Sequence, residues 1–311
     1  MVQIFKSTNI DFIENRRKFF FISAMMLLLT VFIFIYRGGP NYGIDFTGGV
    51  LMQTSFQQEV KLQDVRFALE RNNINSFELQ SSGNAVMIRV KKDLITREEF
   101  ESSVKGAIQE AFPNNSMTID RVEYVGPSVG AYLSKQAFYA FFFAFIGMIV
   151  YVAFRFKSWL WGMASVLGII HDVVISFGFV IFANKEVSIT VIAALLTVAG
   201  YSINDTIVLF DRIKENLRFS TKEDFGKVIN TSINEVLART VVTSLTVFMV
   251  ASSLFFFGGE VLHTFSYIML IGTILGVFST LFICTPIVYE WEQRKKNRLK
   301  VAVKKGYANS K

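Results

Sequence analysis

Ionisable side chains stand inside long apolar stretches at three places in this sequence. His171 and Asp172 interrupt one stretch, Asn204 and Asp205 interrupt another, and Arg239 stands at the head of a third. A charge within a membrane helix is costly, so it typically marks an ion or proton path or pairs with another polar group. Asp205 is therefore predicted to carry the function of the chain. The alternative is an aspartate that only joins helices.

Depth along the helices indicates which of these groups can meet. At about 1.5 Å per residue, Asp205 lies roughly 9 Å from Asp211, where its apolar stretch breaks into charge. Arg239 enters its own stretch at the corresponding end, and its side chain can extend several ångströms along the helix. Because pairing would offset the cost of burying either charge, the sequence predicts an Asp205–Arg239 pair. Proton uptake by Asp205 would release the partner and couple proton movement to a change of shape.

Asp172 is predicted either to extend that path or to bond to a neighbouring helix. It lies roughly 18 Å from Leu160, so its depth differs from that of Asp205 by roughly 9 Å. This separation disfavours an intramembrane aspartyl protease, in which two carboxyls must share one proton. His171 lies about 100° around the helix from Asp172 and is expected to be a core residue.

The elements that position these residues follow from composition. Of the 311 residues, 52% are hydrophobic and 18% are charged, which is typical of a polytopic membrane protein when the apolar residues form long blocks. The first block is predicted to be a retained signal anchor, because no small-residue cleavage site follows it. Cys284, the one cysteine, provides no disulfide framework and no CxxC metal pair. The six predicted spans are residues 19–36, 137–154, 160–182, 189–210, 239–257 and 265–289.

The distribution of Lys and Arg predicts the orientation of the spans. Four precede the first span, five lie in residues 211–238 and eight follow Tyr289, whereas residues 183–188 carry one and 258–263 none. Positive charge marks the cytoplasmic side, so residues 1–18 and the tail 290–311 are predicted to be cytoplasmic. The net charge of +7 is then explained by topology and by attraction to lipid headgroups, without nucleic acid. Residues 211–239 are expected to lie as amphipathic helix along that face.

The polar segment 37–135 is predicted to form a small extracytoplasmic domain. Strand patterns at 50–56, 77–80, 86–90 and 117–125 alternate with helix patterns at 60–72 and 96–112. The order β-α-β-β-α-β is ferredoxin-like, with two helices on one face of an antiparallel sheet. Thr96, Arg97, Glu98 and Glu99 form a capping box at the second helix. The segment contains no His, no Cys and no nucleophile–base pair, so we expect a binding or packing module.

Glycine patterns mark turns and helix contacts. The loop of Gly43, Asp45, Phe46, Gly48 and Gly49 at the entry of the domain is interpreted as a turn rather than a ligand site, because it lacks the Lys and Ser/Thr of a P-loop. Two small-residue pairs four positions apart are predicted to be helix-packing seams. These pairs are Gly272 with Gly276 and Ala164 with Gly168.

Several motifs resemble the SecD/SecF family of RND-related secretion proteins. They are the fourth-span signature Gly200, Ser202, Asn204, Asp205, Thr206, Asp211 and Arg212, the Gly43–Gly49 loop, His171-Asp172-Val173, and Arg239-Thr240. The resemblance covers nearly the whole chain. It implies an α-helical polytopic membrane protein with six transmembrane helices, an RND-type half bundle, and a small α+β ferredoxin-like extracytoplasmic domain. It also implies pairing with SecD in a twelve-span unit beside the SecYEG channel.

In this resemblance, proton flow drives the extracytoplasmic domains to pull unfolded preproteins outward across the bacterial inner membrane. Asp205 matches the proton-carrying carboxylate, Arg239 matches its basic partner, and Asp172 extends the path. No cofactor and no enzymatic activity are expected, and the coupling ion is H⁺ or Na⁺, since a carboxylate suits either. From the residues alone, an RND-type exporter of lipid or small molecules and a non-transporting membrane scaffold stay open.

Overall fold

The chain forms two compact units. The membrane unit comprises Met1–Pro40, Ala140–Lys185 and Thr190–Lys311, and the α/β unit comprises Asn41–Tyr139 and Glu186–Ile189. The computed structural model describes residues 9–72, 74, 77–82, 85–90, 97–219 and 224–295. Thr96 of the predicted capping box, residues 1–8 of the predicted cytoplasmic N-terminus and residues 296–311 of the predicted tail lie outside these ranges.

Among the residues that the structure describes, six helices are long and apolar enough to cross a membrane, which confirms the predicted number of spans. The last span is composite, because helix α9 leads into a π-helical turn at Thr280–Cys284 and the chain continues as helix to Lys295. The helices are α1 (Arg16–Arg37), α5 (Pro127–Phe156), α6 (Trp159–Phe182), α7 (Ile189–Phe219), α8 (Phe225–Phe257) and α9 (Gly259–Ser279).

The helix ends correct one sequence prediction. The described residues of the segment 211–239 do not form a separate amphipathic helix, since residues 211–219 extend α7 and residues 225–239 begin α8. The two extensions are joined by Arg212 Nε, which donates to Glu235 at 2.7 Å, and by Asn216 Nδ2, which donates to Ser232 at 3.0 Å. The mixed charges that predict a surface helix thus pair across two antiparallel helices. A second difference is that α5 begins at Pro127, within the segment predicted to belong to the polar domain.

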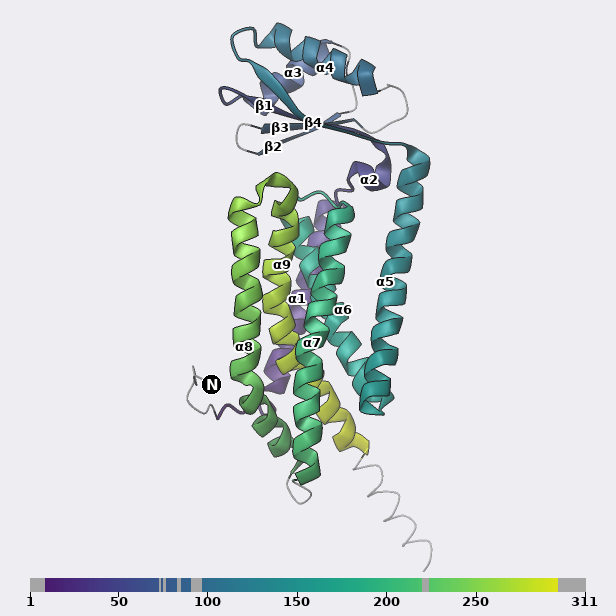
Figure 1. Cartoon of the computed structure of the whole chain (residues 1–311), viewed down its shortest axis with the longest axis vertical. Helices are drawn as coiled ribbons and strands as arrows, with labels where there is room; N and C mark the ends of the chain where they lie inside the picture. The colour runs from purple at the N-terminus through teal and green to yellow at the C-terminus, as the bar shows by residue number, and fades with distance from the viewer. Residues whose placement is uncertain are drawn as a thin grey trace, which may run out of the picture. The chain divides into compact units, whose positions relative to one another are not determined.

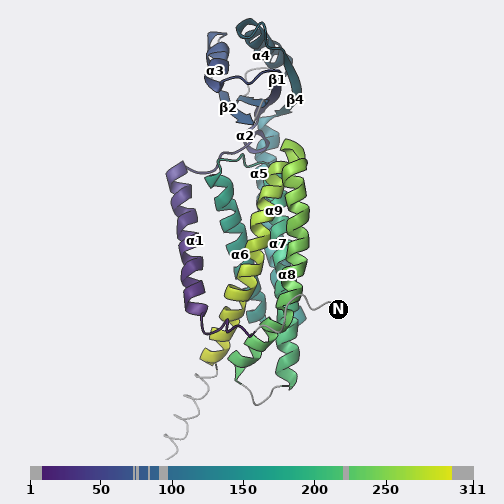
Figure 2. The same ribbon diagram turned by 90° about the vertical axis from the view of Figure 1, so that its left-hand side faces the viewer.

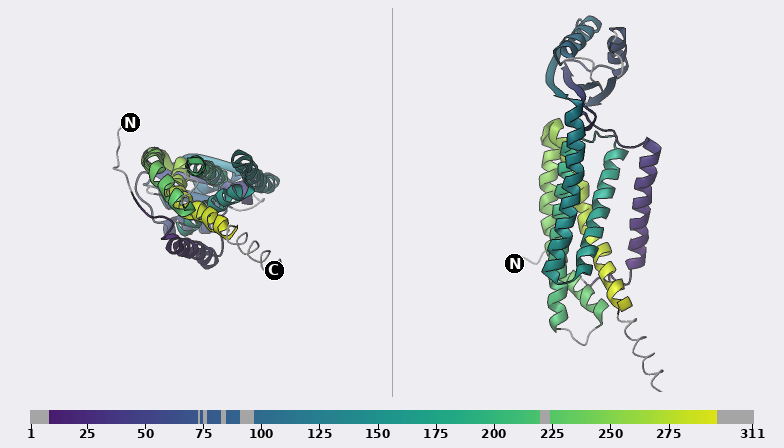
Figure 3. Two further views of the ribbon diagram at one scale, coloured as in Figure 1. Left: turned by 90° about the horizontal axis from the view of Figure 1, so that it is seen from below. Right: turned by 90° about the vertical axis from the view of Figure 1, so that its right-hand side faces the viewer.

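Small residues bring the membrane helices together. α1 packs on α6, and α9 packs on both α6 and α8, with α1 at the edge of the bundle (Figures 2 and 3). A Cβ atom on Gly272 would overlap the side chain of Val198, and one on Gly276 would lie 3.4 Å from Ser202 Cβ. The predicted seam in the last span is therefore confirmed as the contact between α9 and α7. Gly168 in α6 likewise faces Cys284.

The α/β unit has the predicted ferredoxin-like order. Its antiparallel sheet runs β2-β3-β1-β4, and α3 and α4 cover one face (Figure 1). Phe100, Met52, Leu69, Ile88 and Ile108 are the largest fully buried side chains of this unit. The elements are α2 (Ile44–Thr47), β1 (Gly49–Phe56), α3 (Leu62–Arg71), β2 (Phe77–Ser82), β3 (Ala85–Val90), α4 (Arg97–Ala111) and β4 (Met117–Val125).

We predict that Gly272→Leu lowers the stability of the membrane unit, because its side chain would collide with Val198 across the α7–α9 seam. Overpacking of this kind costs about 1–3 kcal/mol. Thermal unfolding in detergent measures the effect. Gly147→Leu is the matched control, since a Cβ there meets nothing within 4 Å. Equal losses in the two variants would contradict the assigned seam.

Candidate functional site

Asp172 in α6 lies at the centre of a buried polar cluster. Its side chain is 0% exposed. Oδ2 accepts hydrogen bonds from Ser202 Oγ of α7 at 2.7 Å and from Ser279 Oγ of α9 at 2.6 Å. Oδ1 lies 3.0 Å from His171 Nδ1. Because an unpaired carboxylate in an apolar bundle would be strongly unfavourable, these donors fix where three helices meet.

Asp205 in α7 lies beside this cluster and is 3% exposed. Its Oδ2 accepts a hydrogen bond from Ser244 Oγ of α8 at 3.3 Å, and Ser244 Oγ accepts one from Tyr201 Oη at 3.1 Å. Ser202, which donates to Asp172, is one helical turn from Asp205, or about 4.5 Å along the axis. The two carboxyls therefore belong to one hydroxyl-rich region built from α6, α7, α8 and α9.

The π-helical turn follows directly after Ser279. Thr280 Oγ1 lies 2.8 Å from Thr206 Oγ1 of α7, and Thr285 Oγ1 donates to Thr280 O at 2.8 Å. Two consecutive residues of the last span thus bond to two different helices. Ser279 bonds to Asp172 of α6, and Thr280 bonds to Thr206 of α7. The π turn locally changes the helical register, and such turns are frequent at functional sites.

Asp205 and Arg239 do not form the ion pair that the sequence predicts. Among the residues that the structure describes, no salt bridge joins them, and Arg239 is exposed on α8. The Arg212–Glu235 and Asp205–Ser244 contacts place Arg239 about one turn from the level of Asp205. Its charge acts on the carboxyl through space, while Ser244 provides the direct hydrogen bond.

The predicted depth difference between the carboxyls is also wrong. Asp172 contacts Ser202, one turn from Asp205, whereas the sequence placed the two aspartates about two turns apart. Counting residues from the helix ends gives the depth only for upright helices that begin in one plane, but α6 and α9 slant relative to α8 (Figure 2). Even so, the carboxyls share no hydrogen bond in the described ranges, so the geometry gives no support to a protease dyad.

His171 is a buried core residue as predicted. It is 4% exposed, and its ring lies 6.1 Å from that of Phe278. Its Nδ1 nevertheless contacts Asp172, which the sequence did not predict, and Nε2 has no hydrogen-bond partner within the described part of the chain.

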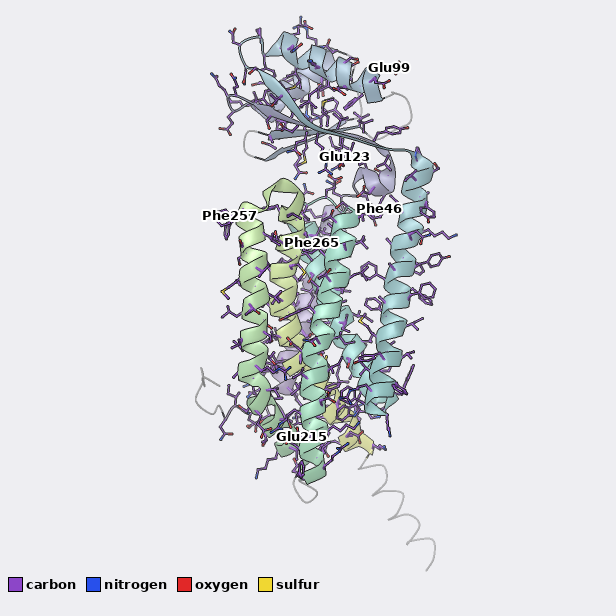
Figure 4. The ribbon with its side chains drawn as sticks, viewed as in Figure 1. Phe46, Glu99, Glu123, Glu215, Phe257 and Phe265 are labelled. Atoms are coloured by element: carbon purple, nitrogen blue, oxygen red, sulfur yellow. The ribbon has the colours of Figure 1, made fainter. Side chains whose placement is uncertain are left out.

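The other fourth-span motif residues lie in three different surroundings. Thr206 is buried at the site, whereas Gly200 and Asn204 are exposed on one face of α7. Asp211 pairs with Arg155 at 2.8 Å, and Arg212 pairs with Glu235 and Glu215 on the helical extensions, where Figure 4 labels Glu215. The residues of the loop motif, Gly43, Asp45, Phe46, Gly48 and Gly49, belong to the α/β unit.

Sequence reasoning missed the hydroxyl groups of Ser244, Ser279 and Thr280. Each stands inside an apolar span, where Ser and Thr side chains commonly bond across helices. The sequence therefore indicates these residues only by their residue type and by their position within a span. Which side chain each hydroxyl would reach depends on the slant of the helices and on the π turn.

Comparisons with known proteins agree with this architecture. The family model described as protein export membrane protein SecD/SecF, C-terminal, matches residues 103–294, and the SecD/SecF GG motif matches residues 33–60. The protein translocase subunit SecF of Endomicrobium trichonymphae is 69% identical over 310 residues, which cover 100% of both chains. The SecF subunit of Calditerrivibrio nitroreducens is 39% identical, covering 91% of this chain and 94% of its own.

The crystal structure of SecDF, a translocon-associated membrane protein from Thermus thermophilus, superposes with a TM-score of 0.84 at 31% identity. It matches 92% of this chain, but the chain spans only 39% of that protein. The six spans, the buried carboxyls and the α/β unit after the first span thus define a multi-pass membrane protein of the SecD/SecF class. Within that class, the chain belongs to the SecF family.

We predict that Ser279→Ala destabilises the membrane unit, because Asp172 loses one of its buried donors. The expected cost is about 1–3 kcal/mol, measured by thermal unfolding in detergent. Ser176→Ala provides a matched control, since this buried α6 hydroxyl has no partner in the part of the chain that is described. An equal effect of both substitutions would show that the hydrogen bond to Asp172 contributes nothing.

Proposed function

We propose that this chain is the ion-responsive half of an accessory complex of the Sec protein translocase. Together with SecD, it uses the proton motive force to promote export of unfolded preproteins through the SecYEG channel. The observation that carries this proposal is the buried pair of carboxyls, Asp172 and Asp205, held by hydroxyl donors from three helices. Intramembrane carboxylates in such surroundings are typical of proton paths.

The physical step begins at Asp205. As a carboxylate it accepts from Ser244 and lies in the field of Arg239, and as a neutral acid it can donate a hydrogen bond of its own. Proton uptake therefore removes the attraction to Arg239 and changes which hydroxyls can bond to it. Because Tyr201 and Ser244 bond each other between α7 and α8, the change acts on the contact of these helices.

Pairing with SecD fits the polar face that α7 and α8 expose. Gly200 and Asn204 lie on α7, and Arg239 and Thr246 lie on α8, all exposed in the single chain. Polar groups at membrane depth face protein or a water-filled cavity rather than lipid. This face therefore suits a second six-span half, and the larger length of the Thermus SecDF chain supports that arrangement.

The proposed location is the bacterial inner membrane, with both termini in the cytoplasm. The basic residues before α1 and after α9 support this orientation by the positive-inside rule. In it, Asp211 and the extensions of α7 and α8 face the cytoplasm, and the α/β unit acts on the emerging chain outside. The complex acts by binding and movement, and the chain has no catalytic role and needs no cofactor.

We predict that Asp205→Asn abolishes the rise in preprotein export that a proton gradient produces, because the amide cannot change its charge. Export into inverted membrane vesicles, with and without the gradient, measures this. The variant should still insert and bind SecD. Asp64→Asn, an exposed carboxylate of the α/β unit, should behave as wild type. Gradient-stimulated export by Asp205→Asn would favour the scaffold alternative.

A charge swap tests the link between Asp205 and Arg239. We expect Asp205→Arg combined with Arg239→Asp to recover part of the stimulation that each single substitution removes, since the two groups interact across one helical turn. A double-mutant cycle on the same export assay gives the coupling. Equal damage in the double and single variants would contradict the interaction.

Co-purification separates the proposal from a self-sufficient exporter of lipid or small molecules. In mild detergent, we expect a SecD-like six-span protein to travel with the chain. Transport of lipid by the purified chain alone would support the exporter instead.

Replacing the proton gradient by a sodium gradient in the export assay decides between H⁺ and Na⁺ as the coupling ion.

A further inference from the structure

The loop motif near the start of the α/β unit binds the segment that leads into α7. Gly43 N donates to Val187 O at 2.8 Å, and Val187 N donates to Asn41 O at 2.7 Å. Tyr42 and Val187 thereby form a short parallel bridge between segments that lie far apart in the sequence. Residues Glu186–Ile189 consequently belong to the α/β unit, although they connect two membrane helices.

Asp45 completes this connection at the first residue of α7. Its Oδ2 accepts a hydrogen bond from Ile189 N at 2.8 Å. The first N–H groups of a helix have no partner within the helix, and a carboxylate there also interacts favourably with the helix dipole. Asp45, which lies in α2 next to Phe46 (Figure 4), therefore acts as a cap supplied from 144 residues away along the chain.

Arg89 fastens the same segment to the sheet. This β3 residue is 4% exposed, and its guanidinium pairs with Glu186 and, at 2.9 Å, with Glu78 of β2. It also donates to Asn41 Oδ1 at 3.2 Å. Burial lowers the pKa of Arg89, and the Glu78 carboxylate opposes that shift. A buried charge with this set of partners is costly to disrupt, so residues 186–189 are held firmly to β3.

Glycines stand where these segments approach most closely. A Cβ on Gly43 would collide with the Glu186 side chain, and Gly48 has a φ of +71°, which favours glycine. A Cβ on Gly130, at the start of α5, would lie 2.9 Å from Phe46 O. The motif is thus built for close backbone contact with its neighbours, beyond the turn that the sequence predicted.

We propose that the Gly43–Gly49 loop is a clamp that fixes the first residue of α7 to the sheet, with Asp45 as its positioning residue. α7 is one continuous helix from Ile189 through Asp205, a span of about 24 Å. A displacement of α7 at Asp205 is then passed to the α/β unit through the capped end of the helix. This second part rests on the proposed function, whereas the clamp itself does not.

Hydrogen exchange of the full chain in detergent tests the clamp. In Asp45→Ala, the amides of residues 189–192 should exchange roughly fivefold faster than in wild type, as expected from loss of one helix cap. Asp45→Asn keeps an acceptor oxygen and should exchange nearly as wild type. Asp64→Ala, an exposed carboxylate on α3, is the matched control and should leave these amides unchanged. Unchanged exchange in Asp45→Ala would overturn the clamp.

The gradient-dependent export assay tests transmission. Asp45→Ala should lose most of the gradient-stimulated rise, and Asp45→Asn should recover it. Faster exchange combined with full stimulation in Asp45→Ala would overturn transmission through the clamp. Failure of the proposed function gives a different result, because wild type itself would then show no gradient-stimulated rise while the exchange difference persisted.

Discussion

The burial of the Asp172 carboxyl constrains the whole membrane unit. A carboxyl in an apolar bundle must be supplied with donors from its surroundings, and here they come from α7 and α9, while the neighbouring His171 ring lies 3.0 Å from the other carboxyl oxygen. Gly168 of α6 lies against Cys284 and Ser279, so α6 and the last span approach closely where Ser279 donates to Asp172. The site and the helix seams therefore depend on the same small residues, which permit close packing and also bring the hydroxyls within hydrogen-bonding distance.

Much of this architecture was predictable from the sequence. Apolar blocks and alternating strand patterns predict the six spans and the ferredoxin-like order, because both depend on local periodicity. Asp172 and Asp205 stand out because charge is rare in such spans. The partners of the carboxyls were less accessible, since Ser244 and Ser279 look like many other serines in membrane helices. Their roles depend on how the helices are tilted, and counting residues along a helix axis gives no information on tilt.

Two further differences arose from contacts that are distant along the chain. Charged residues after Asp211 suggested a surface helix, but Arg212 and Glu235 satisfy each other between two extended helices. The Gly43–Gly49 loop suggested a turn, and its glycines do shape the backbone there. Its partner Val187 lies far away in a short polar connection, so no local pattern pointed to their bridge.

The π-helical turn at Thr280–Cys284 also affects how the last span should be probed by substitution. A π turn contains one residue more than the α-helical turn it replaces, so the helix after it is rotated by about 100° relative to an uninterrupted α-helix. Positions before Thr280 and after Cys284 consequently follow two separate helical wheels. A scan of this span analysed with a single wheel would assign Val288, which is fully buried, to the wrong face.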